Sequence, residues 1–108
     1  MRQLVDIQGA SGAGVDSGIL DTVGMKAMLV IVANSGSVAS GVPTASLVRD
    51  DGSEVVVKSG TAVAAGGAST ALSWGGSGPI NAPLPRKVRF SVPGVANATI
   101  RLTVGAAG

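Results

Sequence analysis

Short segments of alternating apolar and polar residues, separated by clusters of Gly, Ser, Pro and Asn, recur along the chain. A period of two places the apolar side chains on one face of an extended strand, so it predicts half-buried β-strands. Val, Ile and Thr supply 16, 5 and 6 of the 108 residues, whereas Glu occurs once and Lys three times. β-Branched residues favour pleated strands, and formers of exposed helix other than Ala are nearly lacking. The sequence therefore predicts an all-β chain.

We expect a single domain over residues 1–108, folded as a small antiparallel β-sandwich, jelly-roll-like, of about eight short strands. No internal repeat and no long linker divides the sequence. The expected strands are Arg2–Gln8, a short one near Gly18–Val23, Lys26–Ala33, Thr44–Arg49, Ser53–Lys58, Thr61–Ala65, Thr70–Trp74, Arg86–Val92 and Ala98–Val104.

Two hairpins are predicted by pattern. Asp51-Gly52 lies between two β-branched runs and supplies the positive φ that a tight turn needs. The alternating segments Arg86–Val92 and Ala98–Val104 are expected to pair with each other across a short turn, with Arg89 opposite Arg101. Like charges in that position are unfavourable unless the side chains diverge into solvent or an acid lies over them. The acid could be Asp6 or Asp21 of the same chain, or it could belong to the surface of a partner.

The segment Ala27–Ala33 is apolar without alternation, so both faces of the expected strand carry apolar side chains. One face carries Met28, Val30 and Val32, and the other carries Leu29 and Ile31. A strand that is apolar on both sides is covered on both sides. The sequence allows two explanations for the second apolar face. It could lie in a subunit interface, or the strand could be central in the core with a curled neighbouring strand over it.

The stretch Gly60–Pro85 is rich in Gly, Ala and Pro and predicts thin strands with a long loop, which in a small β domain often carries contacts. It contains Trp74, the single Trp of the sequence. A buried or interface anchor is the expected role of Trp74. An exposed indole that stacks on a sugar ring is the alternative.

The charge is divided between the two halves of the chain. Residues 1–54 hold three basic residues against all six acids, a net charge of −3, whereas residues 55–108 hold five basic residues and no acid, a net charge of +5. We expect these charges to pair across strands of one sheet system. The same basic residues, Arg86, Lys87, Arg89 and Arg101, are with Trp74 the candidate partner-binding residues.

The sequence lacks the side chains that most catalytic sites use, because it has no His and no Cys. The six carboxylates are scattered without metal-loop spacing, and the Gly9–Gly14 stretch lacks the Lys and the helix opening of a phosphate loop. A Ser–Lys pair is formally available, but each Lys lies in a strand-like run where a solvated side chain is expected. We therefore predict a non-enzyme without cofactor or metal.

Neither a membrane nor nucleic acid is an expected partner. The longest apolar run has seven residues, far short of the roughly 20 that a membrane helix needs, and the first residues do not resemble a signal peptide. The basic residues near the C-terminus lack the interleaved aromatics that stack on bases.

The chain resembles the jelly-roll decoration (cement) proteins of tailed-bacteriophage capsids. The resemblance lies in composition and layout: Asp21-Thr22-Val23-Gly24 leading into Ala27–Ala33, the Asp51-Gly52 hairpin, and the alternating Arg86–Val104 region. It carries over no individual site residue.

This resemblance implies a virion structural protein on the capsid exterior, a homo-oligomer that binds and stabilises the major capsid protein shell. Weak contacts multiplied by the lattice would hold it there, with the basic residues meeting an acidic shell. A phage tail or fibre component and a carbohydrate-binding module are the alternatives.

Overall fold

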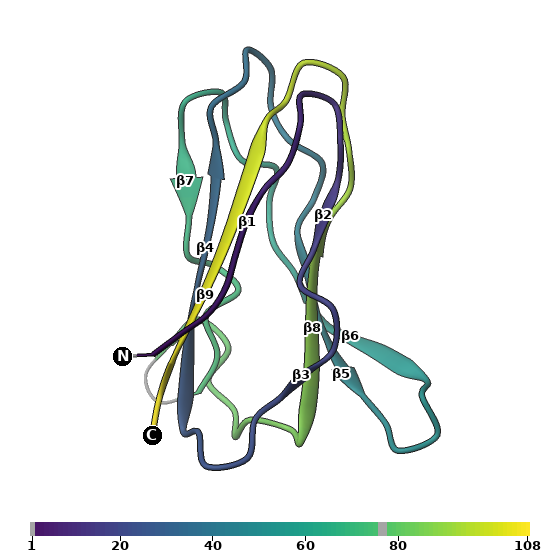
Figure 1. The fold of residues 1–108 in the computed structure, drawn as a ribbon, viewed down its shortest axis with the longest axis vertical. Coiled ribbons are helices and arrows are strands. Elements are labelled where there is room, and N and C mark those ends of the chain that lie inside the picture. The colour runs from purple at the N-terminus through teal and green to yellow at the C-terminus, as the bar shows by residue number, and fades with distance from the viewer. Residues whose placement is uncertain (1, 76–77) are drawn as a thin grey trace.

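The computed structural model describes residues 2–75 and 78–108, and it is an all-β sandwich of two antiparallel sheets (Figure 1). The first sheet has the order β1-β9-β4-β7, and the second has the order β2-β8-β5-β6 with β3 pairing β8 as well. The prediction of a small β-sandwich is confirmed. The strands are β1 (Arg2–Gln8), β2 (Val15–Asp16), β3 (Leu20–Asp21), β4 (Ala27–Asn34), β5 (Thr44–Val48), β6 (Glu54–Ser59), β7 (Ala68–Ser69), β8 (Lys87–Val92) and β9 (Ile100–Ala107).

The core lies between the inner faces of the two sheets, where period-two patterning places every second side chain. Strand β4 shows this as strict alternation of half-buried and buried residues, and β8 does the same. The largest side chains in the core are Trp74, Phe90, Met28, Ile100 and Leu102. Among the nine strands described, only the β2–β3 and β5–β6 connections stay within one sheet, so the sheets are joined by repeated crossings.

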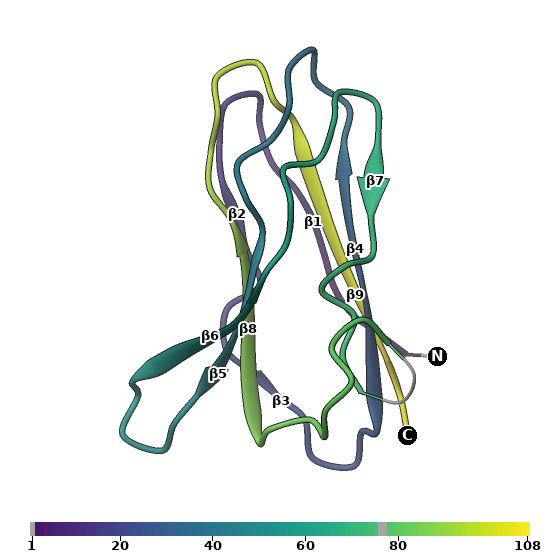
Figure 2. The same cartoon turned by 180° about the vertical axis from the view of Figure 1, so that it is seen from behind.

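The prediction that Arg86–Val92 pairs with Ala98–Val104 is wrong. Strand β8 pairs with β2, β3 and β5, whereas β9 lies in the other sheet between β1 and β4 (Figures 1 and 2). Arg89 and Arg101 therefore lie on opposite outer faces of the sandwich. Alternation specifies which face of a strand is buried, and that face is the same whether two strands pair edge to edge or stack across a core.

The β5–β6 hairpin is confirmed, with a wider turn than expected. Arg49 N–H donates to Ser53 O at 2.8 Å and Gly52 N–H donates to Arg49 O at 2.9 Å. Gly52 has φ of 88°, whereas the one described non-glycine residue with positive φ is Asn97. The Asp50–Gly52 segment is thus a three-residue loop that ends in a left-handed glycine, rather than a two-residue turn with positive φ at both positions.

The two thin strands predicted in the Gly60–Pro85 stretch are wrong in position. Thr61–Ala65 forms no strand, Thr70–Trp74 contributes an isolated bridge through Trp74, and the observed strand β7 lies between them. Small side chains pack too little surface to hold the backbone of such a stretch in a strand, so its path follows the few larger side chains that enter the core, Val63, Leu72, Trp74 and Ile80. Residues 76 and 77 of the stretch lie outside the described residues.

Candidate functional site

The four basic residues expected to bind a partner do not form one patch. Lys87 and Arg89 alternate with core residues on β8 and face outward from the second sheet, with Arg86 just before that strand. Arg101 lies on β9 and faces outward from the first sheet. The sandwich thickness separates these two groups, so one flat acidic surface cannot contact both.

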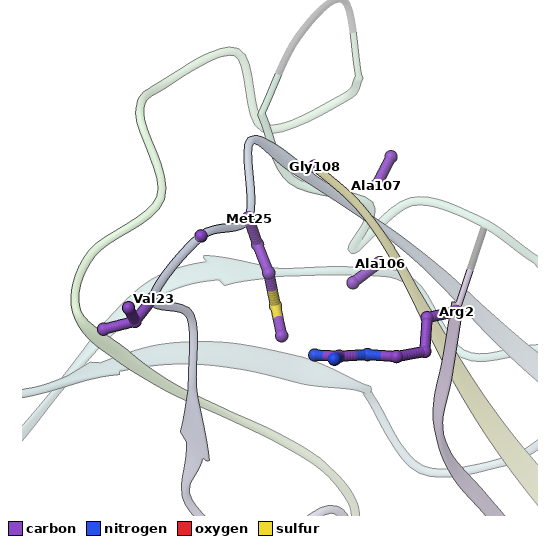
Figure 3. A pocket seen from close by; sticks show the side chains of 7 residues that line it. Arg2, Val23, Met25, Ala106, Ala107 and Gly108 are labelled. Carbon is purple, nitrogen blue, oxygen red and sulfur yellow. The ribbon is translucent and has the colours of Figure 1, made fainter.

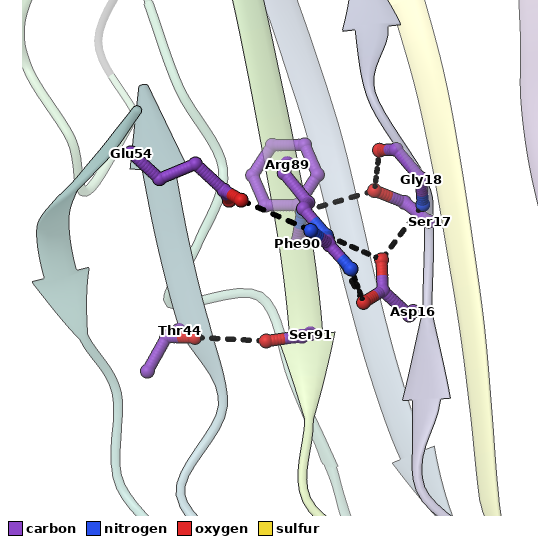
Figure 4. A network of polar contacts seen from close by, with 8 residues as sticks. All are labelled: Asp16, Ser17, Gly18, Thr44, Glu54, Arg89, Phe90 and Ser91. Atoms are coloured by element: carbon purple, nitrogen blue, oxygen red, sulfur yellow. Dashed lines mark hydrogen bonds and ion pairs between the residues drawn. The ribbon is translucent and has the colours of Figure 1, made fainter. Parts of the chain in front are cut away.

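Arg89 is the centre of a polar network on the outer face of the second sheet (Figure 4). Its Nε donates to Oδ1 and Oδ2 of Asp16 at 2.9 and 3.0 Å, and its NH1 donates to Oε2 of Glu54 at 3.0 Å. The two carboxylates raise the pKa of Arg89, and its hydrogen bonds hold the pKa of Asp16 below the ordinary value. The backbone N–H of Gly18, which turns the chain out of β2, also donates to Oδ1 of Asp16, at 2.8 Å.

Arg101 and Arg86 also have acidic partners within the chain. Arg101 binds Asp6 in a bidentate pair, with Nε and NH2 at 2.8 and 2.7 Å from the two carboxylate oxygens. This pair lowers the pKa of Asp6 and raises that of Arg101. Nε of Arg86 lies 3.5 Å from Oδ1 of Asp21. The expectation that the acidic and basic halves pair across strands is confirmed, and these arginines contribute little free positive charge.

Trp74 lies in the core with 2% of its surface exposed. Its backbone pairs with Met28 of β4, and its indole packs against Phe90 of β8. The ring therefore presents no face to a sugar or to a partner surface in this conformation. Burial was the expected role of Trp74, and the carbohydrate-binding alternative loses the exposed indole on which it depended.

The outer face of β4 carries two apolar side chains that do not belong to the core. Leu29 and Ile31 are only half-buried, because they point away from the core that covers the opposite face of β4. With Thr103 and Gly105 of β9 and Gln3 of β1 they line a hollow of about 220 Å³. We call these five residues the outer strip. The sequence predicted an apolar second face at this position, and the described part of the chain places no second layer of strands over it.

A second hollow of about 490 Å³ lies near one end of the sandwich, where Arg2 extends beside Met25 (Figure 3). Its other lining residues are small or apolar: Val23, Gly24, Ala106, Ala107 and Gly108. A small-molecule site needs several convergent polar groups to orient its ligand. This hollow offers one cation, so we assign no ligand to it.

Within residues 2–75 and 78–108, no group of three or more acidic, His or Cys side chains gathers as a metal site. The same residues contain no helix long and apolar enough to cross a membrane. Comparison with protein families, curated proteins and solved structures finds no match to this chain.

The sequence predicted the apolar face of Leu29 and Ile31 and the charge pairing, but it did not indicate the rest of the outer strip or the specific acids that bind Arg89. Asp16 and Glu54 are distant from Arg89 in sequence, and no local pattern links them. The four strands β2, β8, β5 and β6 bring them together by lying in that order. It also missed Asn34, a polar residue with 1% of its surface exposed that ends β4 and whose side chain binds three loops. The position of Asn34 directly after an apolar strand was the only available signal.

Proposed function

We propose that this chain is a virion structural protein, a capsid decoration (cement) protein that binds and stabilises the shell of a major capsid protein. The observation that supports the proposal is the outer strip, through which copies of the chain would associate into the oligomer that such a protein forms. The core of the sandwich is already closed by the two inner faces, yet Leu29 and Ile31 leave a second apolar face on the outside. A second copy of the chain that covers this face removes apolar surface from water.

We assign the outer strip to self-association of the chain. Strands β4 and β9 have eight residues each, so their outer faces extend roughly 27 Å and suit packing against a second sheet. The Asp6–Arg101 pair borders the strip on β1 and β9 and supplies a polar rim. A homo-oligomer presents several copies of its shell-binding surface, so weak individual contacts add up to stable occupancy.

The charge pairing changes the proposed mechanism. A shell that attracts Arg86, Arg89 or Arg101 would have to displace a carboxylate that each already binds. Surface ion pairs of this kind add little net affinity and weaken with salt. Uncharged surface therefore supplies the contact area in our proposal, since the fourth predicted residue, Lys87, is half-buried and lies opposite Asp21.

Self-association is tested by sedimentation equilibrium of the purified chain. We expect an oligomer that Leu29→Lys converts to a folded monomer, because a charge then has to be buried in the strip. Val56→Lys is the matched control, since Val56 is 56% exposed and lies on the protruding β5–β6 hairpin away from the strip. A wild-type chain that stays monomeric at high concentration would contradict the assignment of the strip.

The location in the virion needs a separate measurement. Peptides of this chain are expected in purified heads and absent from purified tails of the source virus. Recovery from tails alone would favour a tail or fibre component instead. Empty shells that bind the chain should resist heating better than bare shells, whereas a shell of unchanged stability would contradict the cement role.

A further inference from the structure

Four loops at one end of the sandwich contain no charged residue. They are residues 9–14, 35–43, 60–67 and 93–99, and every Asp, Glu, Lys and Arg of the chain lies elsewhere. The loops gather at the end opposite the β3–β4 connection, at the upper end of Figures 1 and 2. We call this surface the loop end. The opposite end carries the charged tip of the β5–β6 hairpin and the charged residues beside β3 and β8.

Hydrogen bonds between the loops hold the loop end together. Asn34 is their hub: its Nδ2 donates to Val38 O at 2.8 Å and to Val63 O at 3.0 Å. Its Oδ1 accepts from Gly36 N–H at 2.9 Å and from Thr99 N–H at 3.2 Å. One buried side chain thus joins three of the four loops.

Glycines let the loops approach more closely than other residues would. A Cβ on Gly36 would lie 2.3 Å from Asn97 O, and one on Gly94 would lie 2.5 Å from Gly12 O. Gly12 N–H also donates to Ala98 O, which ties the remaining loop to the others. A surface fixed in this way loses little conformational entropy on binding.

The exposed chemistry of the loop end suits a protein partner. Val38, Val42 and Val95 are 37%, 45% and 36% exposed among small Ala, Ser and Gly residues. Charge depletion is typical of the centre of protein–protein interfaces. Nucleic acid would require Lys or Arg there, and a sugar would require an exposed aromatic ring. Small side chains also let a partner approach the backbone closely.

The size of the loop end decides between two protein partners. The whole chain, with the β5–β6 hairpin included, measures 28 by 20 Å across its long axis, so the loop end covers a projected area of no more than about 560 Å² on each partner. A total near 1,100 Å² lies below the roughly 1,200–2,000 Å² of a stable pair, so a second copy would bind weakly. A repeating lattice overcomes this weakness by multiplying the contact.

We propose that the loop end is the surface that contacts the capsid shell, on an uncharged area of the shell protein. This inference rests on the proposed function and adds to it which end of the sandwich faces the shell. It also gives the outer strip and the loop end different partners, since the strip lies along the side of the sandwich. A chain bound in this way stands end-on, with its charged hairpin pointing away from the shell.

The test is co-sedimentation of the purified chain with empty shells assembled from the major capsid protein of the same genome. Ala96 is exposed in the 93–99 loop, and Ala82 is exposed near the opposite end. Ala96→Asp and Ala96→Lys are each expected to weaken shell binding about ten-fold, because either charge must be desolvated in the contact. Ala82→Asp and Ala82→Lys are the matched controls and should bind within about two-fold of wild type.

The remaining outcomes of this binding experiment contradict either the proposed function or the role of the loop end. If the wild-type chain does not bind shells, the proposed function fails and this inference fails with it. If it binds and the Ala96 variants bind equally well, the inference alone fails. Weakening by one sign of charge only would mean charge recognition instead of an uncharged contact. Loss of self-association with unchanged shell binding would make a second copy the occupant, which also overturns the inference.

Discussion

The indole of Trp74 meets the ring of Phe90 edge-on, with ring centroids 6.4 Å apart and ring planes at 76°. Phe90 belongs to β8 of the second sheet, and Trp74 bridges to Met28 on β4 of the first. The contact therefore spans the core and joins the two sheets. Edge-to-face pairs of this kind contribute beyond the area they bury.

Removing the indole should strongly destabilise the chain. Trp74→Ala is expected to lower the free energy of unfolding by about 3–5 kcal/mol, because it leaves a large cavity between the sheets. A small domain has only about 5–15 kcal/mol in total, so this variant should be close to unfolding. Chemical denaturation followed by far-UV circular dichroism measures the loss. Val57→Ala, at an exposed valine, is the control, and an equal effect of both variants would contradict the core role of Trp74.

Two glycines should respond differently to the same added methyl group. Gly36→Ala places a Cβ 2.3 Å from Asn97 O and should destabilise by about 1–3 kcal/mol, because the loops must separate. At Gly60 the nearest atom lies at 3.6 Å, an ordinary contact, so Gly60→Ala should be neutral or stabilise by about 0.4–1 kcal/mol. Thermal melting of the two variants checks this, and similar melting temperatures would contradict the close approach at Gly36.

Asn34 should be essential to the stability of the loop end. Asn34→Ala removes four hydrogen bonds: Val63 O keeps its bond from Ser40 N–H, but the other three backbone groups lose this partner, and each orphaned buried group costs about 1–3 kcal/mol. We expect a loss of at least about 2 kcal/mol in chemical denaturation, with faster hydrogen exchange in residues 35–43 and 93–99. Asn81→Ala, at an exposed Asn, is the control. Unchanged exchange in both loops would show that Asn34 does not hold them.

Two lowered pKa values make the stability of the chain depend on pH. A hydrogen bond from Arg101 lowers the pKa of Asp6, and a hydrogen bond from Arg89 lowers the pKa of Asp16. Because these carboxyls bind protons more weakly in the native state than in the unfolded state, stability rises with pH in the acid range. The stability that these two carboxylates contribute is complete above their pKa in the unfolded chain, about 3.9, and is lost as the pH falls through their lower pKa in the native state. The absence of His predicts little change between about pH 5 and pH 7.

Denaturation midpoints measured from pH 2 to pH 7 test this prediction. The midpoint should be nearly constant at the upper end and fall below about pH 4. The double variant Asp6→Asn, Asp16→Asn should be less stable than wild type at neutral pH. Its denaturation midpoint should also fall less than that of wild type when the pH is lowered. An acid slope equal to that of wild type would mean that these two ion pairs do not couple folding to protonation.

The outer strip shows how far local pattern reaches. The lack of alternation over Ala27–Ala33 predicted that Leu29 and Ile31 would form a second apolar face, and β4 carries that face on the outside of its sheet. The pattern did not show which segment would cover the inner face. That cover includes Trp74 and Phe90, which come from segments more than forty residues away.

Residue type and short-range spacing suffice to predict the strand-forming character of the chain, the β5–β6 hairpin and the opposite charges of the two halves. The folded chain adds what no local pattern contains: β8 and β9 stack across the core, Arg89 meets Asp16 and Glu54, and four uncharged loops share one end. Period-two alternation specifies a buried face and leaves the neighbouring strand open. The neighbour is selected when all strands compete to bury their apolar faces in one core.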